Sequence, residues 1–142
     1  MEHMFDQILE RDETIIKVIK PIKRPFKYGG APFMYWMMTL NTLFLWPIFV
    51  NKQYKNTYYC YTDKRLIVRT GCFSVQYKSL EYKDITSTEV GVGYWDKKTN
   101  TGTLTFVNPS SHHEHPMKFV AVENPYDLMR DIKEQINLAN EK

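Results

Sequence analysis

The chain has 142 residues, enough for one domain, with 43% hydrophobic residues, 25% charged residues and a net charge of only +3. That small charge argues against nucleic acid as the partner, although basic residues alternate with Tyr between residues 53 and 69. Cys60 and Cys72 have neither metal nor redox spacing and the start lacks the features of a secretion signal, so we expect a reducing, cytoplasmic compartment.

The charge is distributed unevenly along the chain. Residues 1–13 carry a net −4 and residues 84–142 a net −3, whereas residues 14–83 carry twelve Lys or Arg against two carboxylates, a net +10. Basic segments of this kind attract anionic lipid by about 1 kcal/mol for each residue near the surface. The alternative for at least half of these residues is an ordinary solvated face.

The first elements in the chain are short. Residues 1–12 predict a short acidic helix that stands apart from the main domain, which spans 13–142. Residues 14–20 are β-branched and partly alternating, which favours a strand. Pro21 and Pro25 then end this strand and predict an extended connection.

An uncharged stretch at residues 32–50 dominates the hydrophobic pattern, and we place the insertion that contains it at 31–51. As a helix it would reach about 28 Å, close to the thickness of a bilayer. However, Trp36 and Trp46 lie only about 15 Å apart in such a helix, and polar residues occupy its middle. We therefore expect an in-plane or re-entrant helical element, bent near 39–42. The alternative is a buried core helix of a soluble domain.

From residue 57 onward, short strands alternate with turns at intervals of roughly ten residues. A turn at 62–65 joins the first two strands into a hairpin, and residues 96–102 and 108–116 are loops. The predicted strands are 57–61, 66–70, 72–78, 85–94, 103–107 and 117–122.

A C-terminal helix follows the strands. Asn124 suits the N-cap and Pro125 the first helical position. Apolar residues then recur every three or four positions, so that one face is predicted to pack on the sheets. These residues are Leu128, Met129, Ile132, Ile136 and Ala139.

The order of several short motifs resembles the bacterial pleckstrin-homology-like (PH-like) domains, which often occur beside short membrane segments. The resemblance extends over about residues 13–140 and rests on residues 13–21, 61–71, 80–85, 102–106 and 122–127. It implies an α+β fold: a PH-like antiparallel β-barrel or sandwich of about seven strands, capped by the C-terminal helix, with an inserted hydrophobic helical element. The usual family insertion is a longer two-helix hairpin. If the strands on both sides of the insertion belong to one barrel, the insertion begins and ends on one side of a membrane.

The sequence shows no convincing catalytic or metal site. His112, His113 and His115 with Glu114 form the only cluster suggestive of a metal, and we interpret it as a solvated loop. Gly91, Gly93 and Gly102 do not precede a predicted helix, so they predict bulges or close packing instead of a phosphate-binding loop. Cys60 is interpreted as a packing residue. We expect no enzyme activity, no metal and no cofactor.

These observations predict a non-enzymatic PH-like module at the cytoplasmic face of a membrane, which binds lipid or a protein partner. The alternative is a soluble, cytoplasmic interaction module whose apolar segment is a core helix or a homo-oligomer interface. The residues expected to contact the membrane are Phe33, Trp36, Phe44, Trp46 and Phe49. The residues expected to bind lipid or another ligand are Lys23, Arg24, Lys27, Lys52, Lys55, Lys64, Arg65 and Arg69.

Overall fold

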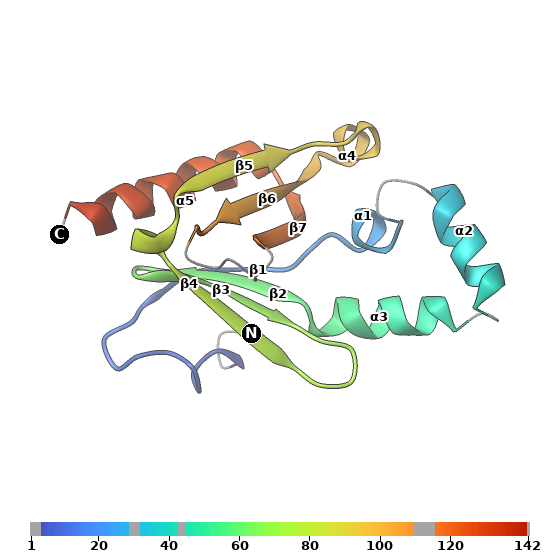
Figure 1. The fold of residues 1–142 in the computed structure, drawn as a ribbon, viewed down its shortest axis with the longest axis horizontal. Helices are drawn as coiled ribbons and strands as arrows, with labels where there is room; N and C mark the ends of the chain where they lie inside the picture. The colour runs from blue at the N-terminus through green and yellow to red at the C-terminus, as the bar shows by residue number, and fades with distance from the viewer. Residues whose placement is uncertain (1–3, 29–31, 43–44, 110–115, 142) are drawn as a thin grey trace.

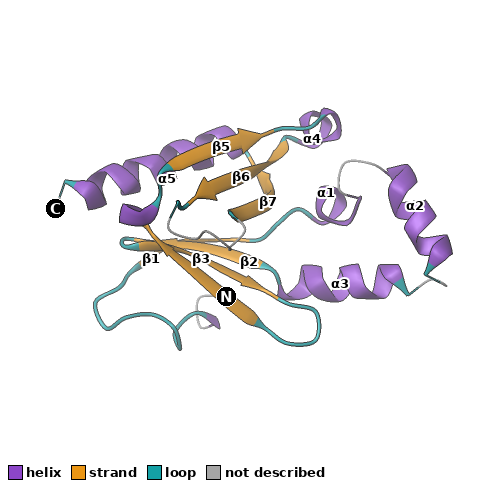
Figure 2. Ribbon diagram, viewed as in Figure 1, coloured by secondary structure: helices purple, strands orange, loops and turns teal. Residues whose placement is uncertain are grey.

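The computed structural model describes residues 4–28, 32–42, 45–109 and 116–141. The strands within these ranges form two antiparallel sheets (Figure 2), and the described strands do not close into a barrel. The four-stranded sheet has the order β1 (Ile15–Ile19), β2 (Tyr58–Thr62), β3 (Arg65–Thr70) and β4 (Gln76–Glu81). The three-stranded sheet has the order β5 (Ser87–Gly91), β6 (Thr101–Val107) and β7 (Met117–Glu123).

Three helices lie between β1 and β2, and the others follow the first sheet. Figure 1 shows α2 and α3 at the end of the molecule opposite the C terminus. The helices are α1 (Lys23–Tyr28), α2 (Pro32–Asn41), α3 (Trp46–Asn56), the 3-10 helix η2 (Tyr82–Asp84), α4 (Tyr94–Thr99) and α5 (Pro125–Asn140).

The main core lies between the two sheets and α5. Tyr59 of β2 stacks on Phe119 of β7 with 4.7 Å between ring centroids, and Phe106 meets the same ring edge-on. Leu128, Met129 and Ile132 of α5 are buried in this core, while Ile136 and Ala139 pack at its margin. The apolar stripe predicted for the C-terminal helix is therefore confirmed.

A bulge in β7 connects this core to the first sheet. Ala121 has a φ of 56°, where residues with a side chain are uncommon, and its carbonyl accepts a hydrogen bond of 2.7 Å from Ile22 N–H. The Tyr59 hydroxyl accepts from Val120 N–H at 2.9 Å and donates to the Val120 carbonyl at 3.1 Å. Burial raises the pKa of Tyr59 to about 12, although its backbone hydrogen bond with Val120 acts in the opposite direction. The hydroxyl therefore stays protonated and able to donate.

A second, smaller cluster covers the outer face of the first sheet. Phe5 is fully buried there against Tyr58, Cys60 and Ile67. In the described part of the predicted N-terminal helix, Met4 has 3-10 conformation and the residues after it form turns. The N–H groups of Ile8 and Leu9 both bond to the Phe5 carbonyl. The acidic N-terminal segment (residues 4–13) is thus packed on the sheet.

Local breaker residues account for the main differences from the predicted elements. Pro25 is the third residue of α1, where its missing N–H costs no helical hydrogen bond, so the expected extended connection was wrong. The predicted loop 96–102 contains most of α4, and Gly93 does precede that helix, contrary to expectation. Strand β4 begins at Gln76, four residues later than predicted.

The start of α5 also differs in detail from the prediction. Asn124 occupies the N-cap position and Pro125 is the first helical residue, as expected. However, the Asn124 side chain does not cap the helix; it accepts a hydrogen bond from the side-chain amide of Asn100. Both asparagines have positive φ, which this residue type tolerates better than most.

Candidate functional site

The hydrophobic stretch folds into two helices that meet at a sharp bend. In the described ranges no single helix is long and apolar enough to cross a bilayer; α2 and α3 together meet the length and composition but bend by 118°. Thr39 and Thr42 donate to the carbonyls of Tyr35 and Met38, so their hydroxyls are satisfied within the helix end. Helix α2 ends at Asn41 and α3 begins at Trp46, so the chain bends next to the 39–42 region expected from the sequence.

Most apolar side chains of these helices face solvent. Phe33 is 75% exposed, Trp36 64% and Ile48 63%, values that a core helix would not show. The stretch is therefore not buried in the core of its own domain. We call this surface the apolar extension; its exposed residues are Phe33, Met34, Trp36, Met37, Met38, Leu40, Leu45, Ile48, Phe49 and, from the β3–β4 hairpin, Phe73.

The tip of the β3–β4 hairpin supports the apolar extension. Gly71 permits the tight turn, since a Cβ there would lie 1.8 Å from the Ser74 carbonyl oxygen. The turn brings the Phe73 ring, 77% exposed, to 5.5 Å from the Phe49 ring and 4.4 Å from Lys52 Nζ. Sequence analysis placed Phe73 in a strand and missed its role here. Gly71 was the one local indication of a hairpin tip.

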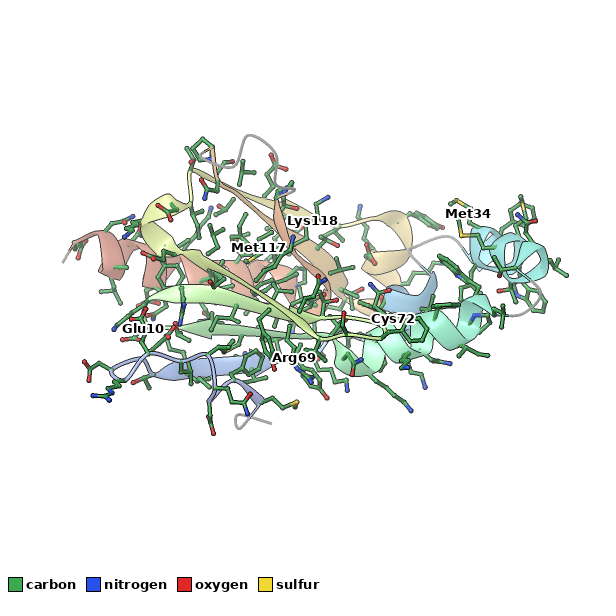
Figure 3. All side chains as sticks on the ribbon, turned by 60° about the horizontal axis from the view of Figure 1, so that its bottom comes forward. Glu10, Met34, Arg69, Cys72, Met117 and Lys118 are labelled. Atoms are coloured by element: carbon green, nitrogen blue, oxygen red, sulfur yellow. The ribbon has the colours of Figure 1, made fainter. Side chains whose placement is uncertain are left out.

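The residues predicted to contact a membrane occupy different environments. Phe33 and Trp36 of α2 and Phe49 of α3 are exposed. Met34 of α2 is labelled at the far end of the molecule in Figure 3. Trp46 is half-buried and lines an open apolar groove of about 620 Å³ along the start of α3. Phe44 lies outside the described residues.

Several predicted basic residues lie beside the apolar extension. Lys23 and Arg24 are exposed on α1, and Lys52 and Lys55 are exposed on α3. Lys27 is in α1, but its side chain lies outside the described part of the structure. The sequence from residue 14 to residue 62 contains seven Lys or Arg and no Asp or Glu. The extension and the strands on both sides of it therefore carry positive charge only.

Lys64 and Arg65 do not join this basic surface. They lie at the start of β3, whereas the hairpin tip that reaches α3 follows the end of β3. Lys64 forms an exposed 3.4 Å ion pair with Glu10. Arg65 forms a 2.8 Å ion pair with Glu13, whose side chain is fully buried, and also donates to the Ile8 carbonyl. Their carboxylate partners hold the N-terminal segment on the sheet.

The surroundings of the Glu13 carboxylate favour its charged form. Burial alone would raise the pKa of Glu13, but hydrogen bonds from the Arg65 guanidinium, Glu10 N–H and the Thr62 hydroxyl outweigh burial and lower it. Arg65 is correspondingly held in its charged form, because the pKa of its guanidinium is raised first by its hydrogen bond with Glu13. This pair has a structural explanation, so we leave Arg65 out of the candidate site.

The described residues give no support to a metal or nucleotide site. No group of three His, Cys, Asp or Glu within them is placed to hold a metal, and the cluster His112 to His115 lies outside them. The N-terminus of α4 is occupied by the Asp96 carboxylate, which accepts from Gly93 N–H. Cys60 is fully buried, as expected of a packing residue, and the rings of Tyr58 and Tyr59 are too buried to stack on bases.

Comparison with known proteins agrees with this architecture. The family model described as bacterial PH domain matches residues 15–136. No curated protein matches the chain. Among solved structures, a DUF1696-family protein with a pleckstrin-homology domain from Shewanella loihica aligns over 96% of this chain and 91% of its own, with 17% identity and a TM-score of 0.51.

A pleckstrin-homology domain from Shewanella amazonensis aligns over 97% of this chain and 84% of its own, again with 17% identity and a TM-score of 0.51. At this identity the two structures support the fold alone: two antiparallel sheets and a C-terminal helix. The family match extends from the first residue of β1 into α5 and includes the apolar extension. The chain therefore belongs to the bacterial PH domain family.

Proposed function

We propose that this chain is a non-enzymatic PH-like module that associates with the cytoplasmic face of a membrane through its apolar extension. The observation that carries the proposal is the exposure of large apolar side chains on α2 and the start of α3, led by Phe33 and Trp36. Exposure of this many large apolar side chains is uncommon on soluble monomers and usually marks contact with lipid or protein. The 118° bend lets both helices lie in one leaflet instead of crossing the bilayer.

The charge around the apolar extension favours anionic lipid as the occupant. Lys52 and Lys55 continue α3 directly beyond its apolar start, and Lys23 and Arg24 lie on the neighbouring α1. Two copies that met through this surface would bring basic residues together without a carboxylate from residues 14–62 to offset them. A homo-oligomer through the same surface, in a soluble cytoplasmic module, is the alternative outcome of the test.

Vesicle binding by full-length protein tests the proposal. Burial of one large apolar side chain stabilises by about 1.5–3 kcal/mol, so Trp36→Ser is expected to weaken binding to vesicles of phosphatidylcholine and phosphatidylserine about ten- to a hundredfold. Tyr126→Ser is the matched control, because Tyr126 is 68% exposed on α5 and outside the extension. Equal binding by Trp36→Ser and the wild type would contradict the proposal.

Cell fractionation complements this measurement. If the apolar extension is embedded in lipid, the protein stays with the membrane pellet through high-salt and carbonate washes and leaves it only in detergent. Release by salt alone would mean that the basic residues hold it electrostatically. A soluble protein that sediments as a discrete oligomer, and becomes a monomer on Trp36→Ser, would support the alternative interface.

A further inference from the structure

Strand β4 forms one edge of the first sheet, and half of its backbone groups point away from that sheet. Tyr82 N–H donates to the Lys64 carbonyl at 3.3 Å, one pair beyond the end of the β3–β4 register. Hydrogen-bonded and non-hydrogen-bonded pairs alternate along an antiparallel ladder, so Leu80 and Lys78 direct their N–H and C=O groups to β3. The residues that direct these groups to the free edge are therefore Tyr77, Ser79 and Glu81.

The free edge of β4 faces a cavity. In the described part of the chain no backbone group pairs with this edge. The cavity measures about 520 Å³ and is lined by residues 77–81 of β4 and residues 116–118 at the start of β7, of which Figure 3 labels Met117 and Lys118. Five consecutive residues of a strand line one cavity along the strand edge, because their side chains alternate between the two faces of the sheet. We call this cavity the β4 slot; it lies where the described strands leave the barrel open.

The β4 slot has an apolar floor and a lysine beside it. The floor includes Val68 of β3 and Phe106 of β6, which are both buried in the main core. Lys78 is opposite Val68 in the register, so its side chain lies on the same inner face of the sheet. Lys78 is exposed and, among the residues that the structure describes, forms no ion pair with a carboxylate. Glu81, at the end of the strand, is already paired with Lys83 at 2.7 Å.

Lys78 makes the free edge selective. A purely apolar strand beside β4 would leave the Lys78 ammonium desolvated without a partner, so an inward-facing lysine disfavours indiscriminate pairing of the edge. The same ammonium favours a strand that carries a carboxylate at the position facing Lys78. Glu81 and Asp84 line the slot at and beyond the end of β4, which disfavours a second acidic residue there. The backbone edge therefore supplies affinity for a strand, and Lys78 restricts which strand is accepted.

We propose that the β4 edge binds an extended, acidic segment of a partner protein, which adds to the first sheet as a further strand. The segment's backbone pairs with the outward N–H and C=O groups of Tyr77, Ser79 and Glu81. Its alternate side chains face the apolar floor of the slot, and one of them is an Asp or Glu that meets Lys78. Extended polypeptide is the ligand whose donors and acceptors repeat at the spacing of a strand edge. The site goes beyond the proposed membrane association, because it uses neither α2 nor α3.

Peptides selected on the full-length protein test the proposal. A library of random dodecapeptides displayed on phage is the probe, and the enriched sequences are synthesised for measurement of their Kd by fluorescence anisotropy. We expect the binders to share an acidic position within a proline-free core. Hydrogen exchange followed by NMR should show that binding protects the N–H groups of Tyr77, Ser79 and Glu81. The N–H groups of Lys78 and Leu80 should not change, because they are already bonded to β3.

Two substitutions separate the backbone edge from the charge. Ser79→Pro removes one outward N–H without breaking a bond to β3, and it should raise the Kd at least about tenfold. Ser79→Ala is the matched control; it keeps the N–H and should change the Kd less than about threefold. Lys78→Glu should weaken binding of the acidic peptides about three- to tenfold and should restore it when their acidic residue is replaced by lysine. This charge exchange tests the site even where Ser79→Pro is unstable.

Several outcomes would overturn the proposal. One is that no peptide is enriched, and another is that Ser79→Pro binds the enriched peptides as tightly as Ser79→Ala does. Slow exchange of the Ser79 N–H in the free monomer would mean that another part of the chain occupies the edge, and protection that grows with protein concentration would assign the edge to a second copy. Trp36→Ser is expected to keep peptide binding, so failure of the membrane proposal would be distinguishable from failure of this one.

Discussion

Replacement of Glu13 by Gln tests how the N-terminal segment is held on the first sheet. The Glu13 carboxylate accepts four hydrogen bonds: two from Arg65 at 2.9 and 2.8 Å, one from the Thr62 hydroxyl at 2.7 Å and one from Glu10 N–H at 3.0 Å. Gln has nearly the same shape as Glu but no charge, and its side-chain NH₂ would face the hydrogen-bond donors that the carboxylate accepts from. Because the Arg65 side chain is 18% exposed and partly hydrated, we expect a loss of about 3 kcal/mol at pH 7, the lower end for a broken buried pair.

The effect should depend on pH with a definite sign. The pKa of Glu13 is lower in the folded state than in the unfolded chain, since the bonds to the carboxylate outweigh the burial that would raise it. Its stabilisation is therefore fully present above the ordinary glutamate pKa of about 4.3 and is lost as pH falls through the lower, folded-state value. The difference in unfolding free energy between wild type and Glu13→Gln should be constant near neutral pH and should shrink below about pH 4.

Urea unfolding followed by tryptophan fluorescence at several pH values measures this difference. Glu10→Gln is the control, because the Glu10 side chain is 61% exposed in a surface ion pair with Lys64, and it should cost at most about 1 kcal/mol. An equal cost for the two variants at pH 7 would refute the structural role of Glu13. So would a Glu13→Gln penalty that stays the same in acid while both proteins remain folded.

Two further substitutions test the packing on either face of the first sheet. Phe5→Ala should lower the unfolding free energy by about 3–5 kcal/mol, because Phe5 is fully buried. Phe73→Ala is the control, at a 77% exposed position, and should cost less than about 1 kcal/mol. Similar urea midpoints for the two variants would contradict this packing. Tyr59→Phe should cost about 1–3 kcal/mol in thermal unfolding, because the backbone N–H and carbonyl of Val120 lose their partner, and Tyr126→Phe on the exposed face of α5 should be neutral.

The elements predicted best are those whose signal is local. The hairpin of β2 and β3, with its turn at residues 62–65, and the helix α5 follow from alternation, turn residues and a helical apolar stripe. The short helices α1 and α4 were missed because Pro25 and Gly93, which signal a break in sequence, sit in or before the first turn of each. Local signals therefore place long elements more reliably than single turns of helix.

The rest of the architecture depends on contacts between distant segments. Nothing near Phe5 in sequence indicates that it covers Ile67, and nothing near Arg65 indicates that its partner is Glu13. Arg65 was predicted to bind a ligand because sequence shows charge without showing what neutralises it. The bulge at Ala121 likewise depends on a hydrogen bond from the N–H of Ile22, a residue far earlier in the chain.

The candidate site was predicted in part. The uncharged stretch and its bend follow from sequence, but exposure does not, because a buried core helix has the same composition. Only the packing of α2 and α3 away from the main core shows that Trp36 is available to a partner. Phe73 joins the surface through the tip of the β3–β4 hairpin, for which Gly71 was the one local indication in the sequence.

The placement of the acidic N-terminal segment sharpens the charge asymmetry seen in sequence. Its carboxylates pair with Lys64 and Arg65 at the start of β3, so the basic region is neutralised at that end. Lys20, Lys52 and Lys55 lie toward the opposite end of the sheet, in or beside α3, where residues 14–62 contribute no carboxylate. Positive potential is thereby concentrated next to the exposed apolar side chains. An anionic surface that attracts the module would meet this end first, and the apolar extension would already face it.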